Sequence, residues 1–161
     1  MPWLLTLLLF GLQSLLTPLL APFSPPDLLL LAALFSLGRV RLLQALLLAY
    51  GLGLLQDVAG SGFVGQHGLG LASGVFFGSW AVSRGGFLQN SLPTQLGAVC
   101  LAWFGKWLAF SLLLSYLGRG QPLGALLQTA SLELLFTLGV TALLHPLLNV
   151  MTRRRERTFY P

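Results

Sequence analysis

Charged side chains are scarce in this sequence. They make up 8% of the 161 residues, whereas a soluble domain carries about 25%. So few charges do not cover the surface of a water-soluble domain, which excludes a soluble enzyme. Intrinsic disorder is excluded as well, because it requires low hydrophobicity, and 55% of these residues are hydrophobic.

Metal ligands are also few. The chain has one cysteine, Cys100, which forms no intramolecular disulfide. Its two histidines, His67 and His145, lie 78 residues apart and match no zinc-binding spacing. We therefore expect no metal centre.

Long apolar segments make up most of the chain. A transmembrane helix needs about 20 apolar residues, and backbone groups in lipid must be hydrogen-bonded within the protein. The apolar blocks are unbroken, which favours helices over the alternating strands of a membrane barrel. The sequence predicts an all-α, polytopic membrane protein with a single six-helix domain over residues 1–152 and a short basic tail over 153–161. The expected spans are 3–21, 28–38, 42–56, 69–83, 96–117 and 123–151.

The second and third segments are short, and two arrangements are open. One long helix over 27–56 would place Arg39 and Arg41 near the middle of the bilayer, at a cost of about 2.5 kcal/mol or more each. A hairpin that turns at these arginines lets both reach the surface, so we expect the hairpin. Pro26 and Asp27 suit the first turn of the second helix, where the positive end of the helix dipole lies.

The basic residues predict an orientation, because cytoplasmic segments are enriched in Lys and Arg. With six spans and a cytoplasmic N-terminus, seven arginines are cytoplasmic and only Arg119 is outside. We expect both termini on the cytoplasmic side of the membrane. The net charge of +5 then reflects topology and contact with anionic lipid rather than nucleic-acid binding. The expected cytoplasmic anchor consists of Arg153, Arg154, Arg155 and Arg157.

Three glycines, Gly70, Gly74 and Gly78, recur every four residues in the fourth segment. This spacing places them on one helix face, where another backbone can approach closely. The partner helix belongs either to the same chain or to another protein.

Lys106 and Glu133 each lie deep in an apolar span. The turn between the last two spans is centred between Arg119 and Gly120, and each charge is thirteen residues from its side of the turn. An antiparallel hairpin therefore brings them together near the middle of the membrane, where a paired charge is tolerated better than an isolated one. We interpret them as a structural ion pair; a proton or ion pathway is the alternative.

A glycine-rich loop connects the third and fourth spans. Residues 60–65 (GSGFVG) match the dinucleotide-binding pattern, but they follow a membrane helix rather than a strand, which indicates a turned outer loop. Asp57 and His67 flank it. We expect them to order the loop through backbone hydrogen bonds, because a catalytic Asp–His pair would also need a nucleophile and an oxyanion hole.

These segments resemble the MreD family of bacterial rod-shape-determining membrane proteins. Residues 26–31 (PDLLLL) resemble the start of the second span of that family. Residues 53–57 (GLLQD), 65–69 (GQHGL) and 78–84 (GSWAVSR) resemble its central block. The motif likeness covers about residues 26–84, and the layout of the whole chain is similar.

The resemblance implies a scaffold with no catalytic residues and no cofactor. MreD-like proteins bind MreC and belong to the elongasome with MreB, RodA and a penicillin-binding transpeptidase, which builds peptidoglycan and maintains rod shape. The family fold resembles the S-components of energy-coupling-factor transporters. Binding of a vitamin-type small molecule is therefore the main alternative, although polar groups for an outer pocket are few. A membrane enzyme that acts on lipids is a third possibility. Such an enzyme usually needs clustered carboxylates to bind a metal, and the four carboxylates of this sequence are widely scattered.

Overall fold

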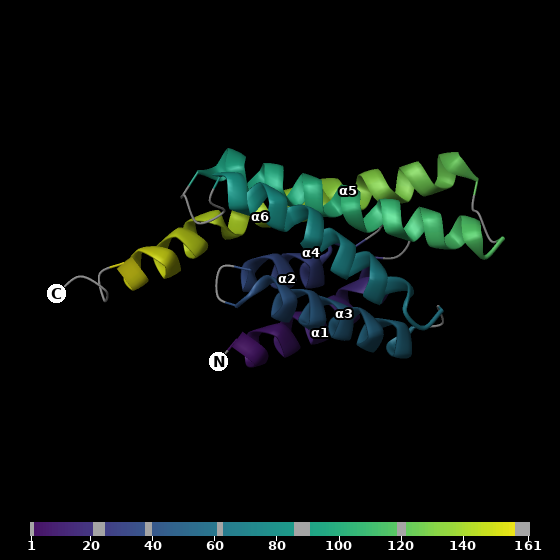
Figure 1. Ribbon diagram of the computed structural model, residues 1–161, viewed down its shortest axis with the longest axis horizontal. Helices are drawn as coiled ribbons and strands as arrows, with labels where there is room; N and C mark the ends of the chain where they lie inside the picture. The colour runs from purple at the N-terminus through teal and green to yellow at the C-terminus, as the bar shows by residue number, and fades with distance from the viewer. Residues whose placement is uncertain are drawn as a thin grey trace.

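A computed structural model shows an all-helical protein (Figure 1), as the sequence predicts. The structure describes residues 2–20, 25–37, 40–60, 63–85, 91–118 and 122–156. Within these ranges the chain forms six helices. They are α1 (Pro2–Leu19), α2 (Leu28–Ser36), α3 (Leu42–Ala59), α4 (Gln66–Gly85), α5 (Leu92–Tyr116) and α6 (Leu123–Glu156).

Three helices are long and apolar enough to cross a membrane. They are α3, α5 and the Gly124–Pro146 part of α6. The apolar stretch found in α1, Leu8–Leu19, is shorter. Length and hydropathy therefore indicate association with a membrane through at least these three helices.

Helices α2 and α3 are separate, so one continuous helix over 27–56 is excluded. α2 ends at Ser36, and Arg41 is the exposed N-cap of α3, where its backbone N–H donates to Gln44 Oε1. Arg39, the other arginine of the expected turn, lies outside the described residues. The chain thus turns between Ser36 and Leu42, as expected from the cost of burying the two arginines in the bilayer.

Helix α2 is short and completely enclosed. Its nine residues rise only about 13 Å, which is less than half of the hydrocarbon thickness. The expected span at 28–38 is therefore only part of a crossing. Residues 28–34 are all buried, which explains why this segment is apolar on every face instead of amphipathic.

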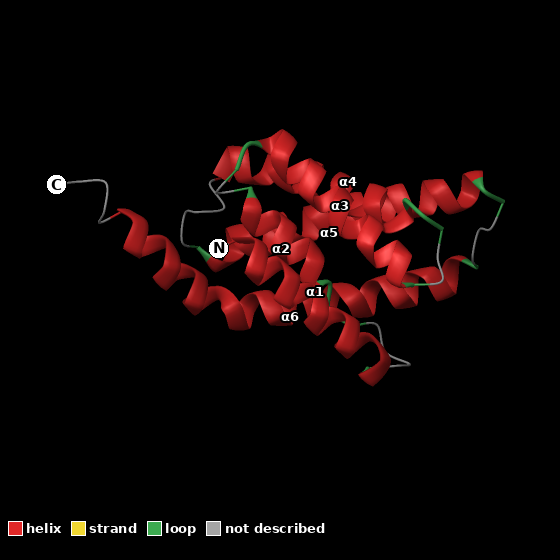
Figure 2. Ribbon diagram, turned by 90° about the horizontal axis from the view of Figure 1, so that it is seen from below, coloured by secondary structure: helices red, strands yellow, loops and turns green. Residues whose placement is uncertain are grey.

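The helices form two groups, and α2 belongs to one of them. Figure 1 shows α1, α2 and α3 on one side and α5 and α6 on the other, with α4 running between them. α4 makes its most extensive contacts with α3 and α5. Figure 2, turned by 90°, shows α6 extending well beyond the bundle at its C-terminal end. In Figure 1 that end of α6 and the start of α1 both lie toward the left.

The basic segment at the end of the chain is not separated from the last helix. α6 continues through Glu156, because neither Pro146 nor the arginines interrupt it. The expected boundary between a domain at 1–152 and a tail at 153–161 therefore falls inside a helix. The side chains of Arg153, Arg154 and Arg155, and all of Arg157, lie outside the described residues.

The glycine stripe of α4 faces helices of the same chain. A methyl group at Gly74 would lie 2.7 Å from Leu30 Cδ1 and 2.8 Å from the carbonyl oxygen of Ala102, and one at Gly78 would meet Leu34 and Ala102. Gly70 is looser, because the nearest atom to its added methyl group, Lys106 Cγ, lies at 3.4 Å. The stripe thus packs α4 against α2 and α5, more tightly at Gly74 and Gly78 than at Gly70.

A second glycine contact joins α3 to α4. A methyl group at Gly53 would overlap the backbone of Gly68 and the carbonyl carbon of His67. The two backbones therefore touch at this point. Their contact places the end of α3 and the start of α4, which carry Asp57 and His67, next to each other.

Candidate functional site

Three charged side chains meet inside the bundle, at the beginning of α2. Lys106 Nζ from α5 lies 2.5 Å from Asp27 Oδ2 and 2.6 Å from Glu133 Oε1 of α6. The side chains of Asp27, Lys106 and Glu133 are only 2%, 10% and 12% exposed, respectively. Two carboxylates share one ammonium group, so the formal charge of this cluster, which we call the charge triad, is −1.

The sequence led to two members of the triad and missed the third. The hairpin register brings Lys106 and Glu133 together, but it supplies no reason to add Asp27, which is 79 residues from Lys106. The interpretation of Lys106 and Glu133 as a two-residue pair is therefore incomplete, because Asp27 also contacts Lys106. The sequence did contain an indication of this. The apolar run after Asp27 is too short to cross the membrane from its surface, so Asp27 is expected below that surface.

The triad lies at the buried N-terminus of α2, where free backbone N–H groups need partners. Asp27 Oδ1 accepts a hydrogen bond from the N–H of Leu30 at 2.9 Å, as an N-cap does. Gln13 Oε1 of α1 accepts from the N–H of Leu29, also at 2.9 Å. The partial positive charge of this helix end adds to Lys106 in stabilising the carboxylate of Asp27.

Helix α6 supplies a polar inner face to the same place. The backbone N–H of Asp27 donates to Thr137 Oγ1 at 3.0 Å, and that hydroxyl donates to the carbonyl of Glu133 at 2.7 Å. Thr141, one turn further on, is also fully buried and donates to the carbonyl of Thr137. The start of α2 is thus bonded to α1, α5 and α6 by polar contacts within an otherwise apolar core.

Asp57 and His67 form a second, smaller polar site, where α3 passes into α4. Asp57 Oδ2 accepts from the N–H of Gly65 at 2.7 Å, and its Oδ1 accepts from the N–H of His67 at 3.1 Å. His67 Nδ1 lies 2.6 Å from Asp57 Oδ1. Gly65 has a φ of +99°, a conformation that favours glycine. The structure thus brings Asp57 and His67 together on the loop that they were expected to order; residues 61 and 62 lie outside the described part.

The chemistry of these two sites is that of structural contacts. Within the described residues, no three His, Cys, Asp or Glu side chains are grouped so that they could hold a metal ion. In the triad every charged group is bonded to another group of the protein. The arrangement can hold helices together. It can also exchange a proton among three ionisable groups, which keeps the alternative of a proton pathway open.

A groove opens at the end of the bundle that carries Arg41. Its volume is about 630 Å³, and apart from Ser79 its lining is apolar. The apolar lining residues are Leu37, Leu42, Phe76, Phe77, Trp80 and Leu101. The groove therefore lies between the turn of the α2–α3 hairpin, the second half of α4, and α5.

Comparison of the chain with family models, with curated proteins and with solved structures gave no match. We therefore infer the function from the structure and from the motif resemblance of the sequence. The structural features used are the triad, the Asp57–His67 contact and the groove.

Proposed function

We propose that this protein is a multi-pass scaffold of the bacterial inner membrane that resembles MreD. In this role it binds MreC and supports peptidoglycan synthesis by the elongasome, together with RodA, a penicillin-binding transpeptidase and MreB. It performs no catalysis itself and needs no cofactor. Rod cell shape is the outcome that depends on it.

The observation that carries this proposal is the use made of the buried charges. Asp27, Lys106 and Glu133 bond to one another and to the start of α2, and they join α2 to α5 and α6. Their polar groups are directed at the protein's own helices, as expected when a bundle must hold one shape for a partner. A transporter subunit would instead direct polar groups at its substrate.

The motif resemblance and the structure also agree at one point. Asp57 and His67 are the aspartate and the histidine of the MreD-like central block, and they contact each other at 2.6 Å. The glycines of the same block, Gly53 and Gly68, form the closest approach of α3 and α4. Two of the resembling segments, 53–57 and 65–69, thus pack against each other, which supports reading them as parts of one motif.

The groove favours a scaffold over a vitamin-binding S-component. An S-component needs a pocket with converging polar groups, open to the outside of the cell. The groove described here is almost wholly apolar and lies beside Arg41, at the end that the arginine distribution places in the cytoplasm.

Both termini are proposed to be cytoplasmic. The start of α1 and the C-terminal end of α6 lie toward the same end of the bundle (Figure 1), which supports this orientation. In this orientation α2 forms only the inner part of the second crossing, because Asp27 lies at the level of Lys106 and α2 continues from there toward Arg41. A reporter active only in the periplasm should be silent after Pro161 and active when inserted at Gly62. The reverse pattern would contradict the proposed orientation.

Purification in mild detergent tests the partner. We expect an affinity-tagged copy of this chain to retain MreC through a wash that removes MreC from an unrelated tagged membrane protein of the same host. The bound fraction should be analysed for proteins and for small molecules at the same time. If MreC is washed away and a vitamin stays bound in stoichiometric amount, the S-component function replaces the scaffold function.

A further inference from the structure

The apolar groove has the size of a ligand site. Its volume of about 630 Å³ falls within the range of about 300–1,000 Å³ that small-molecule sites have. Three turns of helix about 10 Å wide occupy on the order of 1,300 Å³, so the groove is small for a seated helix. A thin, flexible apolar chain fits it better.

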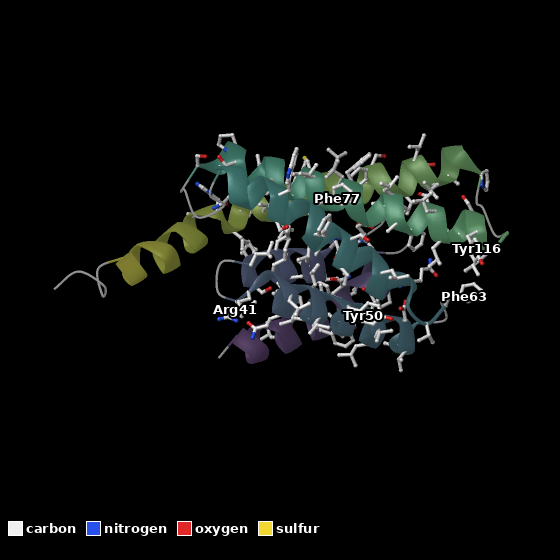
Figure 3. All side chains as sticks on the ribbon, in the orientation of Figure 1. Arg41, Tyr50, Phe63, Phe77 and Tyr116 are labelled. Carbon is white, nitrogen blue, oxygen red and sulfur yellow. The ribbon has the colours of Figure 1, made fainter. Side chains whose placement is uncertain are left out.

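An exposed positive charge lies next to one of the lining residues in the sequence. Arg41 directly precedes the lining residue Leu42, and it is exposed (Figure 3). The acidic side chains that the structure describes are all engaged elsewhere: Asp27 and Glu133 with Lys106, and Asp57 with His67. None of these three carboxylates forms an ion pair with Arg41.

Trp80 indicates the depth at which the groove lies. This side chain lines the groove from α4, five residues before that helix ends, and it is 54% exposed. Tryptophan is enriched at the level of the lipid headgroups, where its ring is in contact with both apolar and polar surroundings. A partly exposed Trp in the lining, together with an exposed Arg that precedes another lining residue, is the combination expected where acyl chains meet phosphates.

We infer that the groove binds one acyl chain of an anionic phospholipid, with the phosphate of that lipid at Arg41. The apolar side chains of α4 and α5 contact the chain, and Ser79 lies among them without preventing this, because its hydroxyl donates to the carbonyl of Phe76. The lipid would fill the space between the α2–α3 turn and α4. This inference depends on the proposed membrane location but not on MreC.

The full-length protein in nanodiscs tests this site. The probe is phosphatidylglycerol that carries a photoreactive diazirine on one acyl chain, with phosphatidylcholine of the same chains as its competitor. We expect cross-linked peptides to concentrate on residues 76–80 and on Leu101. The labelling should favour phosphatidylglycerol by about fivefold, the ratio that one basic residue near an anionic surface provides.

Two pairs of variants separate the charge from the groove. Arg41→Gln should abolish the preference for phosphatidylglycerol, whereas Arg119→Gln, the same change in the α5–α6 connection, should keep it. Ser79→Phe should fill the groove and lower the labelling severalfold. Leu112→Phe should leave the labelling unchanged, because Leu112 is 64% exposed and lies outside the groove lining.

Four results would overturn the inference. Labelling spread evenly over the exposed apolar residues would mean that the groove is not a site. Equal effects of Arg41→Gln and Arg119→Gln would mean that Arg41 does not bind the phosphate. Loss of the groove labelling when a co-purified protein is retained in the nanodisc would assign the groove to that partner. Failure to enter nanodiscs at all would reject the proposed membrane location as well.

Discussion

Replacing Lys106 by Met should destabilise the protein more than any other single change in the charge triad. The substitution removes the one positive charge and leaves Asp27 and Glu133 buried with no counterion. Breaking a buried ion pair in this way typically costs about 3–5 kcal/mol. We expect a large loss of thermal stability in detergent, measured by the temperature at which half of the protein has left the monodisperse peak.

The other two members of the triad should be less critical, because the triad carries one negative charge too many. Glu133→Gln leaves Lys106 paired with Asp27, and should cost about 1.5 kcal/mol, the low end for a hydrogen bond to a charged group. Asp27→Asn keeps an oxygen that can cap α2, since Asn is a good N-cap residue. A two-residue ion pair would instead predict that the changes at Lys106 and Glu133 are equally harmful.

A neutral triad provides the decisive comparison. The triple variant Asp27→Asn, Lys106→Met, Glu133→Gln contains no buried charge and should regain much of the stability that Lys106→Met alone loses. Leu112→Met, at an exposed position on the same helix as Lys106, is the control and should change little. If Lys106→Met is as stable as its control, the triad does not hold the bundle together. If the stable triple variant fails to support rod shape, the charges have a function beyond packing.

Of the two carboxylates in the triad, the sequence predicts the position of Glu133 but not that of Asp27. Glu133 was predictable because α5 and α6 are consecutive, and equal distance from one turn fixes equal depth. Asp27 belongs to a helix that enters the bundle from another part of the chain. Its depth depends on how α2 packs against α5 and α6, and no local pattern contains that information. Thr137 and Gln13, which bond to the same helix end, were missed for the same reason.

The helices themselves were predictable, and their lengths were less so. Apolar blocks separated by Pro, Gly and Arg indicated six helices, and the cost of burying Arg41 correctly divided α2 from α3. The apolar character of residues 28–34 predicts a membrane span, although it reflects burial inside the protein. Composition alone does not distinguish these two environments, because both require apolar side chains.

The largest effect of a single methyl group is expected at Gly53. The contact of this residue with Gly68 joins two backbones, neither of which can rotate away as a side chain can. Gly53→Ala must therefore separate α3 from α4 or bend one of them. Overpacking of a core costs about 1–3 kcal/mol, and we expect the upper end of this range here. The same separation would pull Asp57 away from the N–H groups of Gly65 and His67.

Gly51→Ala is the matched control, two residues earlier on the same helix. A methyl group at Gly51 would have no other atom within 4 Å. The substitution should leave the protein unchanged or stabilise it by up to about 1 kcal/mol, because alanine favours a helix more than glycine does. The two variants differ only in position, so opposite effects on thermal stability in detergent would locate the close approach of α3 and α4 at Gly53. If Gly53→Ala is as stable as Gly51→Ala, the two helices do not meet there, and the packing that holds Asp57 beside His67 must be different.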